Sequence, residues 1–142
     1  MTYYRKTRFR PRKPVRTFRD LEVYQKSLEG AVAFSKKILP VIEEKGYQLK
    51  EEMTKCSLRI PRLIAEAHSA RFDKEESGLK LLDQAMTDSN KMVVYLEQVR
   101  DIYSDKVERV LIEELIRKYV RNRRKIFHLY KAWEKFSQNR EK

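Results

Sequence analysis

Residues 47–72 read YQLKEEMTKCSLRIPRLIAEAHSARF, and this stretch decides the fold. Apolar or small side chains recur in it at helical spacing, which predicts an amphipathic helix. They are Leu49, Met53, Cys56, Ile60, Leu63, Ile64 and Ala67. Pro61 stands inside the pattern, where it lacks a backbone N–H and its ring presses on the carbonyl of Ser57. Because the periodicity continues to Ala67, we expect the helix to bend at Pro61 rather than end there.

A first helix is predicted before this stretch and two more after it. Thr17 with Asp20 is typical of a helix N-terminus, Pro40 bends or ends the helix near Leu39, and Gly46 marks a turn. The expected buried stripe of this first helix is Leu21, Tyr24, Leu28, Ala31, Val32, Ser35, Ile38 and Ile42.

The third and fourth helices also have start signals. Asp73 with Glu76 favours a capping box for one, and Ser104 or Asp105 with Glu108 favours the start of the other. Their expected stripes are Leu79, Leu82, Met86, Ser89, Val93, Leu96, Val99 and Tyr103, and then Leu111, Leu115, Tyr119, Asn122, Ile126, Leu129, Trp133 and Phe136.

Three short connections make neighbouring helices antiparallel, so the predicted fold is an all-α, up-down-up-down four-helix bundle over residues 17–138. A basic N-terminal tail (1–16), which we expect to be disordered by itself, precedes the bundle, and a short C-terminal tail (139–142) follows it.

Asn122 occupies a stripe position where an apolar residue is expected. We therefore predict that it is buried and sets the register of its helix.

Two helices carry a second apolar row beside the main stripe. These rows are Ile112, Ile116, Val120, Phe127 and Tyr130 on the fourth helix, and Met92, Tyr95 and Ile102 on the third. A second buried surface indicates self-association, while a single wide stripe in one thick bundle explains the rows equally well.

The composition fits one helical domain in a reducing compartment. The chain has 142 residues, 38% of them charged, with 3 Gly, 4 Pro and a single Cys, so no intramolecular disulfide can form. No apolar run approaches the ~18 residues of a membrane span. The basic N-terminus lacks the apolar segment of a secretory signal. We therefore expect a cytoplasmic protein with no membrane contact.

Positive charge is concentrated in two places. The net charge is +12, and residues 1–16 contribute seven cations without an acid: Arg5, Lys6, Arg8, Arg10, Arg12, Lys13 and Arg16. Six more cations lie between Ile116 and Ile126: Arg117, Lys118, Arg121, Arg123, Arg124 and Lys125. This pattern predicts phosphate contacts with a nucleic acid, and Tyr3, Tyr4 and Phe9 are candidates for base stacking. A solubilising tail and a plain solvated helix face are the alternatives.

Catalytic and metal sites are poorly supported. Cys56 and His68 lie about 18 Å apart along one helix, too far for a nucleophile and its base. Cys56 falls on the apolar stripe and is expected to be a small core residue. His68 and His128 lie off the main stripes, so we expect both at the surface, and neither has the Glu-x-x-His spacing of a di-iron bundle. We predict no enzyme activity, no cofactor and no metal.

The chain also resembles a known family. The motif Lys55-Cys56-x-x-x-Ile60-Pro61-x-x-Ile64-Ala65-Glu66, preceded by Tyr47-x-Leu49, is similar to the signature of bacterial four-helix bundles encoded in ribosomal RNA intervening sequences. The segment Phe18-x-Asp20-Leu21-x-Val23-Tyr24-Gln25 resembles that family's N-terminal motif, and the resemblance spans about residues 17–137. The chain departs from the pattern at Glu52, Arg59, Leu63 and Ala67. The resemblance implies structural roles for Pro61 and Glu66, with Glu66 free to pair with a cation on a neighbouring helix.

A branch of this family is the accessory variability determinant (Avd) of diversity-generating retroelements. Similarity to it implies a basic homopentamer that binds a reverse transcriptase and RNA, or an RNA/DNA hybrid. We therefore expect an oligomeric RNA-binding accessory protein. The alternatives are a ribosomal RNA intervening-sequence bundle of unknown role and a helical adaptor for acidic proteins.

Overall fold

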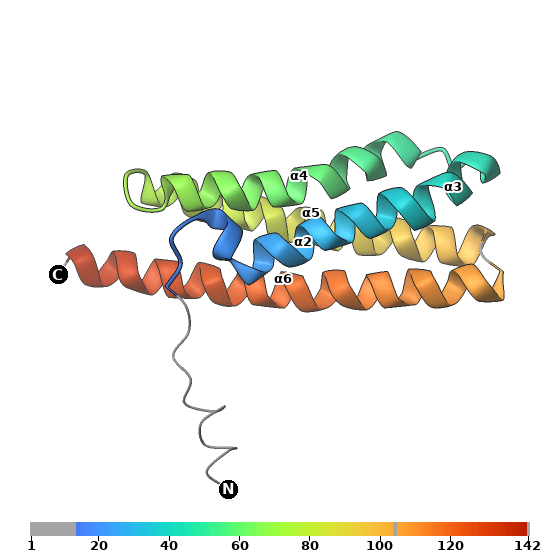
Figure 1. The fold of residues 1–142 in the computed structure, drawn as a ribbon. Coiled ribbons are helices and arrows are strands. Elements are labelled where there is room, and N and C mark those ends of the chain that lie inside the picture. Colours follow the sequence, from blue (N-terminus) through green and yellow to red (C-terminus); the bar gives the residue numbers. More distant parts are fainter. Residues whose placement is uncertain (1–13, 104, 142) are drawn as a thin grey trace, which may run out of the picture.

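A computed structural model describes residues 14–103 and 105–141 (Figure 1). The tail residues Tyr3, Tyr4, Phe9 and the cations up to Lys13 lie outside this part of the chain, as does Ser104. The elements are η1 (Phe18–Asp20), α2 (Glu22–Ala33), η2 (Phe34–Ile38), α3 (Leu39–Lys45), α4 (Lys50–Ala70), α5 (Glu75–Tyr103) and α6 (Lys106–Glu141). The described residues contain no strand.

The predicted all-α bundle is confirmed. The segments α2, η2 and α3 form one continuous rod, which lies with α4, α5 and α6 in an antiparallel arrangement (Figure 1). Each of the four rods packs against two others, in the cyclic order α2, α4, α5, α6. The connection from α4 to α5 and the C-terminal end of α6 lie at the same end of the bundle.

The N-terminal cap has the predicted chemistry but begins a shorter element. The backbone N–H of Arg19 donates to Thr17 Oγ1 at 3.2 Å, and Thr17 N–H donates to Asp20 Oδ2 at 3.1 Å. This capping box starts the 3₁₀ turn η1, and α2 follows from Glu22. The N–H groups of Arg16 and Thr17 hold the pKa of Asp20 below its usual value.

Pro40 does not end the first rod. The five residues before α3 form the π-helical turn η2, and Pro40 lies in the first turn of α3. A proline interrupts the α-helical hydrogen-bond ladder, and the rod departs from that ladder in the π-helical turn directly before Pro40, where the Leu39 N–H donates to the Phe34 carbonyl. The rod ends at Gly46, which adopts the left-handed conformation with φ 74° and confirms the predicted turn.

The helix through the opening stretch runs from Lys50 to Ala70 without a break at Pro61. Pro61 is buried, as are the predicted stripe residues from Met53 to Ala67, whereas Leu49 precedes the helix and is 38% exposed. Ser57, whose carbonyl faces the proline ring, is also buried. The expectation that α4 continues past Pro61 is therefore confirmed.

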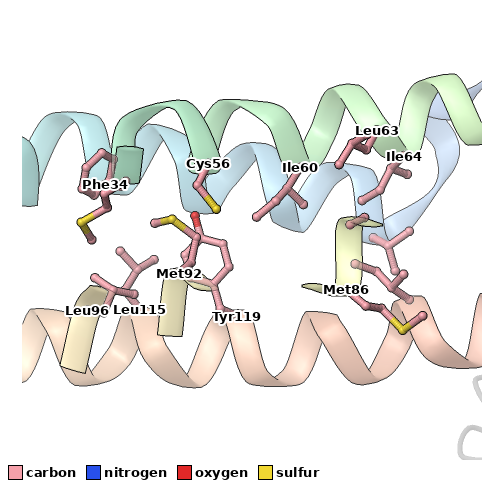
Figure 2. Close-up of a cluster of buried hydrophobic side chains, with 14 of the residues drawn as sticks. Phe34, Cys56, Ile60, Leu63, Ile64, Met86, Met92, Leu96, Leu115 and Tyr119 are labelled. Carbon is pink, nitrogen blue, oxygen red and sulfur yellow. The ribbon is translucent and has the colours of Figure 1, made fainter. Parts of the chain in front are cut away.

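The core is built from all four rods (Figure 2). Figure 2 shows Tyr119 reaching from α6 into the space beside Met92 and Cys56. Its hydroxyl is buried and forms no hydrogen bond within the described residues. The largest fully buried side chains are Phe34, Ile42, Met53, Ile60, Ile64, Leu82, Met92, Leu96, Ile112 and Ile126.

The stripe predicted for the first helix was wrong over part of its length. Leu28 and Val32 are each 43% exposed, whereas Ser27 and Gly30 are buried. The reason is close packing against α6, since a Cβ atom on Gly30 would lie only 3.1 Å from the Tyr119 ring. Small residues allow this approach, and a pattern of large apolar residues does not reveal it. Val23 and Phe34 are the other buried positions that the prediction missed.

Two predictions for the long helices also need correction. Phe136 is 53% exposed rather than part of the core, while Ile112 and Met92, assigned to second rows, are fully buried. Of the remaining second-row residues, Val120 and Phe127 are about two-fifths exposed. The helix α6 continues to Glu141, beyond the expected end of the bundle at residue 138. The last turns of α6 extend past the span of α4 (Figure 1), and Phe136 lies beside Phe72 of the connection between α4 and α5, with the ring centroids 6.1 Å apart.

The starts of α5 and α6 differ in how well the sequence located them. The helix α5 begins at Glu75, two residues after the proposed cap Asp73. Asp105 caps α6, because its Oδ1 accepts the N–H of Glu108 at 3.3 Å.

Candidate nucleic-acid interface

The six cations predicted on α6 fall into three groups. Arg117, Arg121 and Arg124 are exposed and form no ion pair in the part of the chain that the structure describes. Lys118 and Lys125 pair with α2: Lys118 Nζ lies 3.8 Å from Glu29 Oε2, and Lys125 contacts Glu22. Arg123 is half-buried, and its Nε has no hydrogen-bond partner among the described residues.

A groove runs between the first rod and α6 beside these cations. One hollow of about 380 Å³ is lined by Lys37, Arg117, Lys118 and Arg121 together with the apolar residues Ala33, Ile38, Leu111 and Leu115 and the acid Glu114. A second hollow of about 280 Å³ is lined by Glu22, Lys26, Lys118, Arg121, Asn122 and Lys125. The two share Lys118 and Arg121, so they form one surface, which we call the α2–α6 groove. The sequence missed Lys26 and Lys37 because they lie about 90 residues earlier in the chain.

The exposed basic residues of α6 continue beyond the predicted cluster. Residues Arg117, Arg121, Arg124, His128, Lys131 and Lys135 are spaced by three and four positions, so they share one face of the helix, and all are exposed. We call this set the α6 row. At ~1.5 Å per residue it spans about 27 Å. No acid occurs between Leu115 and Trp133.

Asn122 is buried, as predicted, and holds α6 against α2. Its Nδ2 donates to the carbonyl oxygen of Val23 at 3.0 Å, while Oδ1 has no partner among the described residues. The contact lies within one chain, so the register that we predict Asn122 to set is that of α6 on α2. The amide side chain also lines the α2–α6 groove.

A partly buried ion pair that the sequence did not reveal joins α4 to α5. Arg59 donates to both carboxylate oxygens of Asp88, from Nε at 2.7 Å and from Nη2 at 3.1 Å. The Asp88 side chain is only 6% exposed. The Cys56 thiol donates to the backbone carbonyl of Asp88 at 3.3 Å. Burial raises the pKa of this thiol to about 12. Cys56 is thus a core residue, as predicted, and its thiolate is disfavoured.

Glu66 and His68 have surroundings that the sequence did not predict. Glu66 is exposed and pairs with Arg62 of its own helix at 2.7 Å, not with a neighbouring helix. The prediction that His68 lies at the surface was wrong, since it is 6% exposed and its ring lies 6.5 Å from that of Trp133. His68 extends one side of the buried face of α4 past the apolar stripe. His128 is exposed, as expected.

An aromatic slot at the end of α6 was also missed. It has a volume of about 280 Å³ and is lined by Arg71, Phe72, Glu75, Ala132, Trp133, Phe136 and Ser137. Phe72 and Phe136 are about half exposed, and their ring centroids lie 6.1 Å apart. The Arg71 guanidinium lies 4.1 Å from the Phe72 centroid. Trp133 and Phe136 continue the stripe of α6, so periodicity alone assigns them to the core.

The described residues offer neither a metal-binding cluster nor a membrane-spanning helix. Among residues 14–103 and 105–141 no three His, Cys, Asp or Glu side chains gather where they could hold a metal ion. No helix in that part is both long and apolar enough to cross a bilayer.

Comparisons with family models, with curated proteins and with solved structures find no match to this chain.

Proposed function

We propose that this protein binds RNA through the phosphate backbone and performs no catalysis of its own. The observation that carries the proposal is the α6 row, in which Arg117, Arg121 and Arg124 point away from the bundle without ion pairs in the described chain. Cations on one acid-free face repel one another, and a polyanion relieves that repulsion. The N-terminal tail adds seven cations to the same protein.

The α2–α6 groove extends this surface onto the first rod. Lys118 and Lys125 are partly neutralised by Glu29 and Glu22, so they position the two helices more than they attract a ligand. Lys37 and Arg121 remain beside the hollow. Contacts of this kind fix where an RNA lies but read little of its sequence, so we expect weak base specificity.

The identity of the partners follows from the resemblance to the Avd branch. On that basis we propose a homo-oligomer, with a pentamer as the expected form, that serves as an accessory to a reverse transcriptase. A reverse transcriptase gene beside a template and variable repeat would support this assignment. A ribosomal RNA intervening sequence at the locus would support the other branch of the family instead.

The test is a fluorescence-anisotropy titration of a labelled single-stranded RNA at several salt concentrations. The slope of log affinity against log salt is about −0.7 per phosphate contact on single strands. Replacing Arg117, Arg121 and Arg124 with Gln should therefore flatten the slope by about 2. The matched control replaces Lys45, Lys55 and Lys74, exposed cations outside α6, so that the net charge falls equally.

Deleting residues 1–16 in the same assay should flatten the slope further and leave the melting temperature unchanged. Equal slopes for full-length and truncated protein would show that the tail is no nucleic-acid arm. Equal effects of the α6 and control substitutions would show that binding depends on net charge alone and not on the position of the cations. A wild-type protein that does not bind RNA at 50 mM salt would overturn the proposal.

A further inference from the structure

The aromatic slot lies at the same level of α6 as the end of the α6 row, on an adjoining part of the helix circumference. Lys131 and Lys135 of the row flank Trp133 in the sequence, and Phe136 follows Lys135 directly. The slot joins three elements: Arg71 and Phe72 follow α4, Glu75 begins α5, and the remaining residues belong to α6. Ser137 Oγ donates to Glu75, which ties the end of α6 to the start of α5.

The aromatic side chains that line this slot are unusually exposed for their size. Phe72 is 51% and Phe136 is 53% exposed, although both could pack inside a bundle core. Trp133 is only half-buried, with its ring against His68. Aromatic faces beside cations are the surfaces on which unpaired bases stack, because every base presents a π-face. The volume of about 280 Å³ is just below the ~300 Å³ at which ligand pockets begin, so it suits one flat group.

We propose that this slot takes one unpaired nucleobase of an RNA whose phosphates follow the α6 row. The inference rests on the proposed RNA binding and adds a preference for single strands. The Arg71 guanidinium covers one face of Phe72, so the other face of that ring, together with the rings of Phe136 and Trp133, lines the space left for a base. A base-paired duplex keeps its bases stacked on each other and contacts only the row.

Trp133 makes the proposal directly measurable, because it is the only tryptophan in the chain. Its fluorescence is followed during titration with a single-stranded oligoribonucleotide, with an abasic oligonucleotide of equal length, and with a blunt duplex. We expect the single strand to quench the emission while the abasic strand and the duplex leave it nearly unchanged. Anisotropy recorded in parallel reports binding itself.

The variants Phe72→Leu and Phe136→Leu should weaken single-strand binding by about 5- to 150-fold, which corresponds to ~1–3 kcal/mol for a stacked base. Their affinity for the abasic strand should not change. Ile102→Ala is the control, because Ile102 is 63% exposed in the last turn of α5, at the other end of the bundle (Figure 1). Melting curves of each variant confirm that it is folded.

Each contrary result has a distinct meaning. RNA binding without a change in Trp133 emission, or equal quenching by the abasic strand, would overturn the base slot and leave the proposed function standing. An emission that shifts with protein concentration alone would show that a second copy or a protein surface covers the slot. A protein that binds none of the three probes would overturn both proposals.

Discussion

His68 shows how a single residue can make this bundle sensitive to pH. An Arg71 Nη1 atom lies 3.2 Å from His68 Nδ1, and arginine can only donate, so Nδ1 accepts and the proton of the neutral ring lies on Nε2. Burial lowers the pKa of His68, and the neighbouring Arg71 charge lowers it further. The folded protein therefore favours the neutral ring.

The sign of the pH dependence follows from this lowered pKa. In the unfolded chain the histidine pKa is ~6.5, so the unfolded chain binds the proton more readily than the folded protein. The stabilisation that comes from keeping His68 neutral and buried is therefore fully present above that pH. It should be lost as the pH falls through the lower folded pKa. We predict that the melting temperature declines between pH 7.5 and 5.5 and that His68→Gln flattens this decline. Circular dichroism measures it, with the exposed His128→Gln as the control. Parallel curves for wild type and His68→Gln would contradict the prediction.

Asn122 gives a second prediction at this scale. The variant Asn122→Leu removes one hydrogen bond to Val23 but also a buried Oδ1 that has no partner in the described chain. Leucine avoids the desolvation cost of the unpartnered Oδ1, which offsets the lost hydrogen bond, so we expect an unchanged or raised melting temperature. Hydrogen exchange of α2 should become faster, because the register on α6 is no longer fixed by the amide. A melting temperature lower by more than about 3 °C, roughly 1 kcal/mol, would count against this role.

At the scale of elements, the Arg59–Asp88 pair is a polar link between α4 and α5. The Asp88 side chain is nearly buried, whereas that of Arg59 is 37% exposed. Removing the arginine leaves a buried carboxylate whose one remaining ion-pair partner among the described residues is Lys91, 4.0 Å away. We predict that Arg59→Met destabilises the bundle by about 1–3 kcal/mol in urea unfolding.

The double variant Arg59→Met/Asp88→Leu distinguishes pairing from packing. Apolar replacement of both partners of a buried ion pair is often neutral, so most of the lost stability should return. Lys118→Met, which breaks the exposed pair with Glu29, should cost less than about 1 kcal/mol. A double variant no more stable than the single one would show that Asp88 is needed for a reason other than its arginine.

The elements also show what the sequence could and could not predict. Local signals located the helices, because Thr17, Gly46 and Asp105 act through bonds to residues near them in the chain. Partners far apart in sequence were not predictable: Arg59 and Asp88 are 29 residues apart, and Lys125 and Glu22 are 103 apart. The buried face of α2 was misread because Gly30, which contributes no apolar side chain, allows the closest approach to Tyr119.

The candidate site was predicted in part, for the same reason. The cluster from Arg117 to Lys125 could be found in the sequence, because cations close in sequence also lie close on a helix. Its division into paired and unpaired cations depends on Glu22 and Glu29 of another rod. The aromatic slot required knowing that α6 extends past its neighbours, which periodicity does not encode.

At the scale of the whole molecule, the positive charge of the chain opposes self-association, whereas its exposed apolar residues favour it. Val120 and Phe127 lie seven residues apart on one face of α6 and are 42% and 39% exposed. They border Arg124 of the α6 row. Self-association through this face would bring like charges together, which salt screens. RNA binding should instead weaken as the salt concentration rises, because it releases counterions.

We therefore predict an oligomer, expected to be a pentamer, that is tighter in 0.5 M than in 0.05 M salt, as measured by sedimentation velocity and native mass spectrometry. The variant Val120→Glu/Phe127→Glu should shift the equilibrium to monomers, because a carboxylate in an apolar contact loses its hydration. The control is Leu28→Glu/Val32→Glu, which places the same groups at residues of similar exposure on α2. If the control dissociates the oligomer and the α6 variant does not, the contact lies on α2. A wild-type monomer throughout the micromolar range at both salt concentrations would contradict self-association itself. In that case Val120 and Phe127 are isolated exposed side chains, and RNA binding depends on the cations of one chain.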